Sequence, residues 1–258
     1  MAKTLLMIHG VGCGGDVWDR MIPFFEADGW TCEAPTLFPA RRVKDNPPAS
    51  LSELGIDDYI SAMSKKAHEI EKATGKKPAV IGHSMGGLIA QVLAEKGDVS
   101  QAVFLTPAQP KGCAVIGPSV AITFLNILIQ QNRKKSYKVW RTGFDFGVTN
   151  CVPKRLREEI YSHALYDSGK VYGDLTDGVE IDESKIRIPT LTIAAGKDRA
   201  TLASAVRKVG EKYKNAAVPG DFMEYPKNGH WIVDEPGTDK VAADIAGWLA
   251  RTRVKEDA

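Results

Sequence analysis

A short motif around Ser84 contains the residue types of a nucleophilic site. Five residues form the pattern G-x-S-x-G, in which glycines flank a serine: Gly82-His83-Ser84-Met85-Gly86. The apolar stretch 78–81 favours a buried strand, and the alanine-rich stretch 85–96 favours a helix. Ser84 is therefore predicted at a tight strand-to-helix turn, where glycine avoids steric clashes and the helix N-terminus favours negative charge. The alternative is a tight turn whose serine takes no part in chemistry.

Two further polar residues follow expected strands. Asp198 comes directly after the stretch ending at Ala195, and His230 lies in the sequence Asn-Gly-His-Trp a few residues after Tyr225. A serine hydroxyl is a weak nucleophile, so a base must remove its proton and a third group must orient that base. A histidine and a carboxylate are suited to these two tasks. The alternative is that each of them caps the helix that follows it.

Strands and amphipathic helices alternate along most of the chain. Six short stretches are expected to be strands: 4–9, 30–34, 78–81, 101–106, 189–195 and 222–225. Between them apolar residues recur with the period of a helix, as in Tyr59, Ile60, Met63, Ala67 and Ile70. This alternation predicts a parallel sheet with helices on both faces.

One segment breaks the alternation. Residues 112–182 contain the apolar run 120–129, a basic stretch and several aromatic residues. A helix is expected from Pro153 to about Tyr166, because proline is common at the first position of a helix. The simplest interpretation is a helical insertion between two parts of the sheet.

With these features the chain resembles the α/β-hydrolase superfamily, in which G-x-S-x-G forms the nucleophile elbow. The resemblance implies an α/β-hydrolase fold, a mostly parallel sheet flanked by helices. The first expected strand starts within a few residues of Met1, so the family's leading antiparallel hairpin would be absent and about six strands are expected. Residues 1–111 and 186–258 would form the core, and residues 112–185 a helical cap over the active site.

The resemblance also assigns a catalytic triad. Ser84 would be the nucleophile, Asp198 the acid and His230 the base, in the chain order of the family. Three other acidic residues fit less well, because two precede their expected strands and one follows the histidine: Asp182, Asp221 and Asp234.

A tetrahedral intermediate needs backbone N–H donors for its negative charge. Met85, directly after the nucleophile, would supply one donor. The sequence His-Gly-Val-Gly at 9–12 resembles the His-Gly oxyanion motif of the family, and Val11 would supply the other, with Gly12 as the alternative. His9 is expected to hold this loop by hydrogen bonds.

The apolar run 120–129 is expected to cover the pocket. Its seven large apolar side chains leave little polar face, so a helix over this run is expected to be buried on several sides. Phe124 and Leu128 on this run, together with Trp231 beside the histidine, are the predicted pocket residues.

Arg41 and Arg42 mark a departure from the family pattern. They lie where many members have an Asp-x-x-Gly-x-Gly loop after the second strand. We expect solvated loop charges at both positions, with binding of a substrate carboxylate as the alternative.

The composition is that of an ordinary globular protein. Of 258 residues, 43% are hydrophobic, and the net charge of +2 gives no reason to expect nucleic acid or membrane attraction. The N-terminal apolar run is too short for a signal peptide, and 120–129 is too short to span a membrane. The four cysteines show no metal-binding spacing, so free thiols are expected, in a cytoplasmic monomer or homodimer.

The resemblance implies a serine hydrolase that acts by acyl transfer, and we expect it to cleave a carboxylic ester of a small, mainly apolar substrate through an acyl-enzyme intermediate. No metal, organic cofactor or partner beyond that small molecule is expected. Thioesters, lactones, carbon–carbon bonds and perhydrolysis require the same groups and stay open. A second alternative also stays open: the protein could be a receptor that uses the pocket only for recognition and would not turn over a simple ester.

Overall fold

Six parallel strands form the centre of the computed structural model, which describes residues 3–115 and 117–252. Within that part of the chain the strand order is β2-β1-β3-β4-β7-β8, and every neighbouring pair is parallel. The strands have these bounds: β1 Lys3–Ile8, β2 Trp30–Glu33, β3 Ala79–His83, β4 Gln101–Leu105, β7 Thr190–Ala195 and β8 Asp221–Tyr225. The predicted parallel sheet is confirmed, and the carboxyl ends of its strands share one edge.

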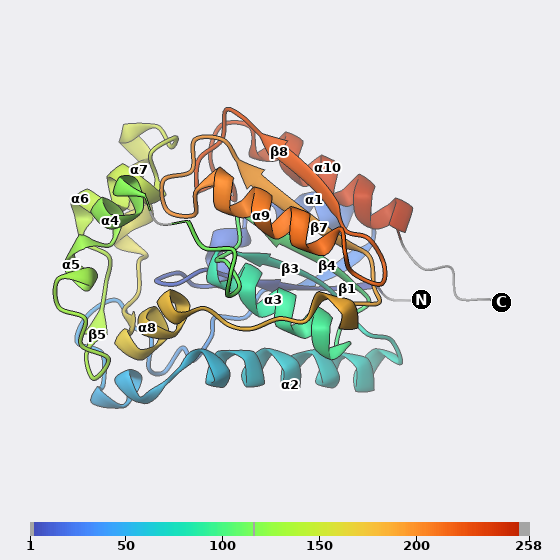
Figure 1. Ribbon diagram of the computed structural model, residues 1–258, viewed down its shortest axis with the longest axis horizontal. Helices are drawn as coiled ribbons and strands as arrows, with labels where there is room; N and C mark the ends of the chain where they lie inside the picture. Colours follow the sequence, from blue (N-terminus) through green and yellow to red (C-terminus); the bar gives the residue numbers. More distant parts are fainter. Residues whose placement is uncertain (1–2, 116, 253–258) are drawn as a thin grey trace.

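Helices cover both faces of this sheet (Figure 1). Successive residues of a strand point to opposite faces, so Leu5 and Met7 of β1 enter one apolar cluster while Leu6 and Ile8 enter another. The first face is covered by α1 (Ile22–Ala27) and α10 (Thr238–Thr252), and the second by α2 (Ile56–Thr74), α3 (Met85–Lys96) and α9 (Ala203–Tyr213).

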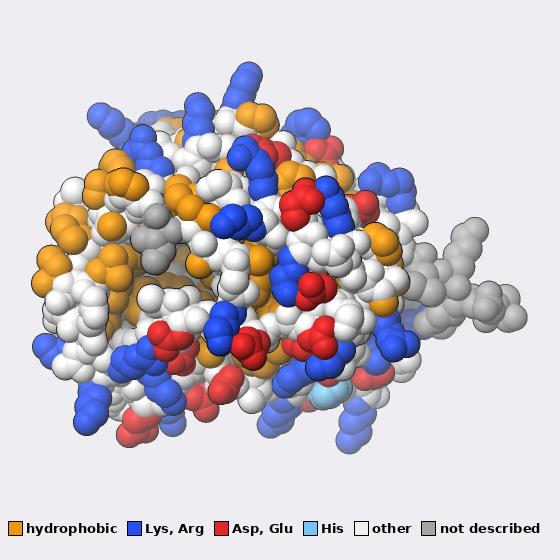
Figure 2. Space-filling view, viewed as in Figure 1, with side chains coloured by type: hydrophobic (Ala, Val, Ile, Leu, Met, Phe, Trp, Pro, Cys, Tyr) orange, Lys and Arg blue, Asp and Glu red, His pale blue; other side chains and the backbone are white. Residues whose placement is uncertain are grey.

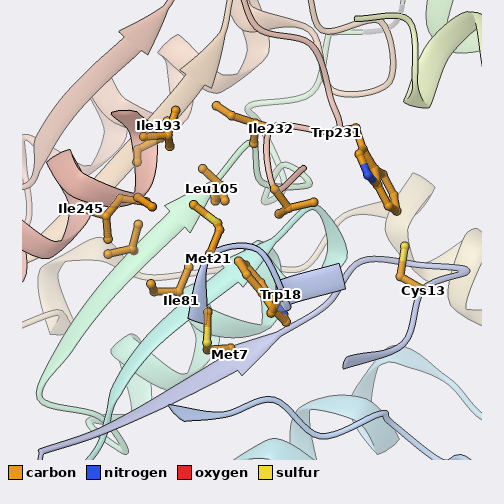
Figure 3. Packing of buried hydrophobic residues seen from close by; sticks show 14 of the residues in the cluster. Met7, Cys13, Trp18, Met21, Ile81, Leu105, Ile193, Trp231, Ile232 and Ile245 are labelled. Atoms are coloured by element: carbon orange, nitrogen blue, oxygen red, sulfur yellow. The ribbon is translucent and has the colours of Figure 1, made fainter. Parts of the chain in front are cut away.

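The first cluster ties four strands to the elements on its face (Figure 3). Side chains from β1, β3, β4 and β7 lie in it, among them Met7, Ile81, Leu105 and Ile193. They pack with Trp18 of the 3-10 turn η1 (Gly15–Trp18) and with Ile245 of α10. Burial of such apolar surface stabilises the fold by about 25 cal/mol per Å², so the strands form a rigid base for the loops at their ends.

The helix α2 shows how the sequence pattern sets an element. The five residues predicted to face inward are all buried: Tyr59, Ile60, Met63, Ala67 and Ile70. The Asp58 carboxylate accepts a hydrogen bond of 2.7 Å from the Gly55 N–H and so caps the first turn. Gly75 ends the helix with a left-handed backbone, φ 75°, as its position in the sequence predicts.

The residues between β4 and β7 form the expected helical insertion, which we call the cap segment (residues 112–185). Its elements are short: α4 (Pro118–Thr123), α5 (Leu125–Leu128), β5 (Ser136–Tyr137), α6 (Arg141–Gly143), the π-helix η3 (Phe144–Val148), α7 (Lys154–Ser162), β6 (Asp167–Ser168), α8 (Gly169–Asp177) and η4 (Glu183–Lys185). Helices α4 to α7 gather at one end of the sheet (Figure 1). We propose that the cap segment is a domain distinct from the core.

The prediction of one helix buried on several sides over 120–129 is wrong. The run is divided at Phe124 into α4 and α5, and Ile129 is 74% exposed. The physical reason is length: each short helix rests on the molecule along one side only, where Thr123 and Ile127 are its buried residues. Hydrophobic side chains are visible at this end of the molecule (Figure 2). Within the described residues, no helix has the length and apolar character needed to cross a membrane.

Candidate active site

Ser84 lies at the junction of β3 and α3, as predicted. Its backbone is strained, with φ 55° and ψ −118°, a conformation that residues other than glycine rarely adopt. The flanking glycines make the turn possible. A Cβ at Gly82 would lie 2.0 Å from the carbonyl oxygen of Gly86, and a Cβ at Gly86 would lie 2.1 Å from the carbonyl oxygen of Ile8.

The structure brings the three predicted triad residues together in one hydrogen-bonded chain. His230 Nε2 is 3.1 Å from Ser84 Oγ, and His230 Nδ1 is 2.8 Å from Asp198 Oδ2. A carboxylate only accepts hydrogen bonds, so the Nδ1–H of His230 donates to Asp198 and leaves Nε2 free to accept from the serine hydroxyl. Both Asp198 and His230 are buried, which shields their contact from water.

The loop after β7 orients Asp198. Its Oδ1 accepts hydrogen bonds of 2.8 Å from the N–H groups of Ala200 and Thr201, and its Oδ2 accepts one of 2.8 Å from the Thr201 hydroxyl. That hydroxyl also lies 3.3 Å from His230 Nδ1. Sequence reasoning missed Thr201, although a threonine three residues after an aspartate at a strand end is the pattern of a side chain that closes such a turn.

A buried glutamate holds the loop of His230. Glu235 Oε1 accepts from the Gly229 N–H at 2.6 Å and from Asn228 Nδ2 at 2.9 Å. Burial raises the pKa of Glu235, while these two hydrogen bonds act in the opposite direction. From the side of the elbow, His83 Nε2 donates to the carbonyl oxygen of His230 at 2.9 Å. The base is therefore fixed on both sides by its own loop and by the nucleophile motif.

The three competing acids have other partners. Asp182 Oδ1 accepts from the Ser184 N–H and caps η4, Asp221 accepts from the Trp248 indole N–H at 2.7 Å, and Asp234 pairs with an exposed arginine. Each of these contacts lies away from His230, so the geometry favours Asp198 over all three.

The loop after β1, residues 10–13, runs beside the nucleophile, and we call it the oxyanion loop. A Cβ at Gly10 would lie 3.0 Å from Ser84 Cβ. The Gly12 N–H donates to Asp167 Oδ2 at 2.7 Å and is therefore occupied. The Val11 N–H has no hydrogen-bond partner among residues 3–115 and 117–252. Met85 opens α3, where the first N–H groups of a helix lack intrahelical partners.

The expectation of a solvated charge at Arg42 is wrong. Its side chain is fully buried and pairs with Asp167 of the cap segment, Nη2 to Oδ2 at 2.7 Å. Burial opposes the charge of Arg42, but the neighbouring Asp167 carboxylate outweighs it and the pKa of Arg42 is raised. Arg41, by contrast, is partly exposed and reaches the carbonyl oxygen of Ser50. Both guanidinium groups are thus engaged within the chain.

A narrow cavity of about 30 Å³ lies beside Ser84, enough space for about two water molecules. Its lining includes Phe124 and Trp231, two of the three predicted pocket residues, but not Leu128. The other walls are mostly apolar: Val11, Val139, Phe144, Val148, Ala164 and Leu165. A wider cavity of about 260 Å³ shares Phe144, Ala164 and Trp231 with it and is bordered by polar residues, including the hydrogen-bonded pair of His163 and Asp16.

No cluster of three or more histidine, cysteine, aspartate or glutamate side chains in the described ranges is arranged to hold a metal. All four cysteines are free thiols, as expected: Cys13, Cys32, Cys113 and Cys151. Burial raises the pKa of the Cys13 thiol to about 12, so this residue of the oxyanion loop stays protonated. Besides His230, the ionisable side chains that line the cavity beside Ser84 are Cys13, His83 and Lys138.

The fold and the strained serine at the carboxyl edge of the sheet define a class of protein. The model of the Alpha/beta hydrolase family matches residues 5–244, and the chain belongs to this family. A curated relative, norfluorocurarine synthase 1 of Strychnos sp., is 23% identical over 240 residues, which cover 91% of this chain and 84% of the relative.

Solved structures have the same fold at low sequence identity. The monoacylglycerol lipase of Paleococcus ferrophilus is 20% identical with a TM-score of 0.71, and the match covers 96% of this chain and 94% of the lipase. Tomato methylketone synthase I is 15% identical with a TM-score of 0.73, and the match covers 98% and 99% of the two chains. At such identity the likeness concerns the fold alone.

Proposed function

We propose that this protein is a serine esterase that hydrolyses a carboxylic ester through an acyl-enzyme. The observation that carries the proposal is the hydrogen-bonded chain from Ser84 Oγ through His230 to Asp198, with contacts of 3.1 and 2.8 Å. A serine in this arrangement has a base at the distance that proton transfer requires. Membership of the family, and a lipase among the structures of the same fold, agree with ester cleavage.

In the proposed mechanism His230 Nε2 takes the proton of Ser84 as its oxygen attacks the ester carbonyl. The resulting imidazolium is stabilised by the Asp198 carboxylate at Nδ1. His230 then gives the proton to the leaving alcohol as the ester bond breaks and the acyl-enzyme forms. Water attacks the acyl-enzyme with the same histidine as base, and the carboxylic acid and free Ser84 are released.

We assign the oxyanion hole to the N–H groups of Val11 and Met85. Gly12, the alternative to Val11, donates its N–H to Asp167 and so has no free donor to offer. Removing one such donor from a related site costs about a hundredfold to a thousandfold in kcat, which makes the choice between the two amides measurable.

The proposed substrate has a short, apolar acyl group. The cavity beside Ser84 is about 30 Å³ and is walled mostly by aliphatic and aromatic side chains, Phe124 and Trp231 among them. A charged acyl group would lose its hydration against these apolar walls, which is costly. Lys138, which also lines the cavity, donates a hydrogen bond from its ammonium group to the Lys44 carbonyl oxygen at 3.1 Å. The alcohol part would lie toward the wider cavity, whose rim carries the polar pair His163 and Asp16.

The experiment is a substrate panel with a matched blank. Nitrophenyl esters of two to eight acyl carbons, a thioester and a lactone are incubated with the wild type and with Ser84→Ala. We expect turnover of the short esters by the wild type and none above background by the variant. An exposed-site control, His68→Ala, is expected to behave as the wild type, because His68 pairs with Asp98 and does not line the cavity beside Ser84. Equal turnover by wild type and Ser84→Ala would refute the proposal, and binding without turnover would favour a receptor.

A further inference from the structure

A buried ion pair joins the cap segment to the core beside the oxyanion loop. Arg42 follows β2 in the core and Asp167 belongs to β6 of the cap, and both side chains are fully buried. Asp167 Oδ2 accepts from Arg42 Nη2 at 2.7 Å, and Oδ1 accepts from Arg42 Nε at 3.1 Å, so the pair is bidentate. Tyr59 of α2 donates its hydroxyl to Asp167 Oδ1 at 2.5 Å.

This pair does more than join two elements, because Asp167 also binds the oxyanion loop. Its Oδ2 accepts from the Gly12 N–H at 2.7 Å, while the carbonyl oxygen of Gly12 accepts from the Leu165 N–H at 2.8 Å. Two residues of the cap segment therefore bind Gly12, one at its N–H group and the other at its carbonyl oxygen. Gly12 has φ 68°, a left-handed conformation that suits glycine, and this conformation is held by both contacts.

The peptide between Gly10 and Val11 is fixed from the core. His9 Nε2 accepts hydrogen bonds from the Leu37 N–H at 3.0 Å and from Arg42 Nη1 at 3.2 Å, so its proton lies on Nδ1 and donates to the Gly10 carbonyl at 2.8 Å. A trans peptide is planar, so fixing the Gly10 carbonyl also fixes the direction of the Val11 N–H. Arg42 Nη2 further donates to the Cys13 carbonyl at 2.9 Å.

We propose that Asp167, neutralised by Arg42, is a positioning residue that keeps the oxyanion loop in its active conformation from the cap segment. By binding the Gly12 N–H, it fixes the peptide between Val11 and Gly12 and leaves the Val11 N–H as the free donor of the loop. The inference rests on the proposed function, because it concerns the oxyanion hole of that reaction. The oxyanion hole would then depend on the packing of the cap segment against the core.

Arg42 is needed in this arrangement because Asp167 carries a negative charge next to the oxyanion loop. A bare carboxylate bound to Gly12 would repel the negative charge that develops at the neighbouring Val11 N–H. Arg42 cancels that charge through a bidentate contact, and the pair presents a hydrogen-bond acceptor to the loop with no net charge. Loss of Arg42 alone is therefore expected to harm the reaction more than loss of both charges.

The test measures the rate constant at which a fluorophosphonate reacts with Ser84, since this reaction needs the oxyanion hole but not the natural substrate. Asp167→Asn removes the charge. The double variant Arg42→Met/Asp167→Leu replaces the pair by apolar side chains, a change that often preserves folding. The matched control is Asp174→Asn, because Asp174 of α8 also links the cap to the core, through the Ile56 N–H at 3.0 Å, far from the loop. Circular dichroism and the melting temperature report folding.

We expect the folded Asp167 variants to react at least about tenfold more slowly than the wild type, with reagent affinity little changed, while Asp174→Asn reacts within about twofold of the wild-type rate. If Asp167→Asn fails to fold, the double variant decides. A folded variant that reacts at the wild-type rate, or a control that is slowed as much as Asp167→Asn, would overturn the positioning role. Absence of any reaction at Ser84 of the wild type would refute the proposed function instead.

Discussion

At the scale of single residues, the three members of the proposed triad should contribute unequally. Ser84→Ala and His230→Ala remove the nucleophile and the base, and each is expected to reduce kcat by up to about a millionfold, because the two act as a unit. Asp198→Ala should cost less, about ten-thousandfold, since the aspartate only orients and supports the histidine. Steady-state kinetics on a short ester measures these losses.

The control for the acid is Asp234→Ala, which removes a carboxylate near His230 in sequence but paired with Arg20 in the structure. We expect its kcat to stay within about twofold of the wild type. If Asp234→Ala, Asp182→Ala or Asp221→Ala abolished turnover while Asp198→Ala left it intact, the assignment of the acid would be wrong.

Two buried histidines should make stability depend on pH. Burial, assisted by Arg42 for His9 and by His230 for His83, lowers the pKa of each histidine to about 3. The unfolded chain binds these protons near pH ~6.5, so between these values unfolding takes up about one proton per histidine. The free energy of unfolding is therefore expected to fall as the pH falls through this window, by about 1.4 kcal/mol per pH unit for each histidine.

Urea denaturation between pH 4 and pH 7 tests this with His83→Gln, which cannot take up a proton. His83 is the suitable site because its Nδ1 has no hydrogen-bond partner in the described part of the chain, and the amide of a glutamine can replace the Nε2–H that donates to the His230 carbonyl oxygen. The free energy of unfolding of the variant should change less steeply with pH than that of the wild type, by the equivalent of about one proton. Identical slopes would show that His83 is protonated in the folded protein.

The place of a single residue could be predicted from the sequence when it depends on the strand just before it, but not when it depends on contacts with a distant segment. Ser84, Asp198 and His230 each follow a strand, and parallel strands bring their carboxyl ends to one edge, so their positions in the sequence, together with the family resemblance, were enough to predict that they lie close together. Arg42 and Asp167 could not be paired in this way. They are separated by more than a hundred residues, and their burial depends on how the cap segment is seated on the core.

At the scale of elements, the elbow depends on two glycines for steric reasons. A Cβ at Gly82 or at Gly86 would lie 2.0 or 2.1 Å from a carbonyl oxygen of the backbone, so strand or helix would have to move. We expect Gly82→Ala and Gly86→Ala to lower the free energy of unfolding by about 3 kcal/mol or more.

The matched control for the elbow is Gly75→Ala at the end of α2. Gly75 has φ 75°, but no atom lies within 4 Å of the position that its Cβ would take. Its substitution should cost only the backbone strain, about 1 kcal/mol. Chemical denaturation measures all three variants, and equal losses at Gly75 and Gly82 would mean that conformation rather than crowding sets the requirement at the elbow.

The cap elements should set acyl-chain preference through Phe124. Phe124 lines the cavity beside Ser84, whereas Leu128, four residues later, does not. Phe124→Ala enlarges the cavity, so longer acyl chains should gain, by about 0.8 kcal/mol or fourfold in kcat/KM for each newly buried methylene. Leu128→Ala should lower the melting temperature without changing the profile. Identical chain-length profiles in wild type and Phe124→Ala would contradict this account of the pocket.

The same run shows where element prediction failed. Its composition predicted one buried helix over 120–129, because apolar content reports burial but not where a helix is interrupted. The division at Phe124 places that side chain in the cavity lining and leaves Ile122 and Ile129 exposed. For the helix α2, by contrast, the amphipathic period predicted the five inward-facing residues and Gly75 predicted the end.

At the scale of the whole molecule, the sheet gathers loops that are distant in sequence around one serine. The elbow after β3, the acid loop after β7 and the histidine loop after β8 meet at the same edge, and the oxyanion loop after β1 joins them. The alternation of strands and helices predicted this arrangement. The contacts between core and cap could not be predicted. Hydrophobic periodicity predicts single helices and strands, but it does not tell which residues of two distant segments pack together.

The central claim is that Ser84 is a nucleophile activated by His230, and one measurement tests it most directly. The protein is treated with a fluorophosphonate, digested and mapped by mass spectrometry, in parallel with Ser84→Ala and His230→Ala. We predict one adduct, on the peptide containing Ser84, absent from Ser84→Ala and greatly slowed in His230→Ala. An adduct on another serine, or labelling that persists in Ser84→Ala, would contradict the account.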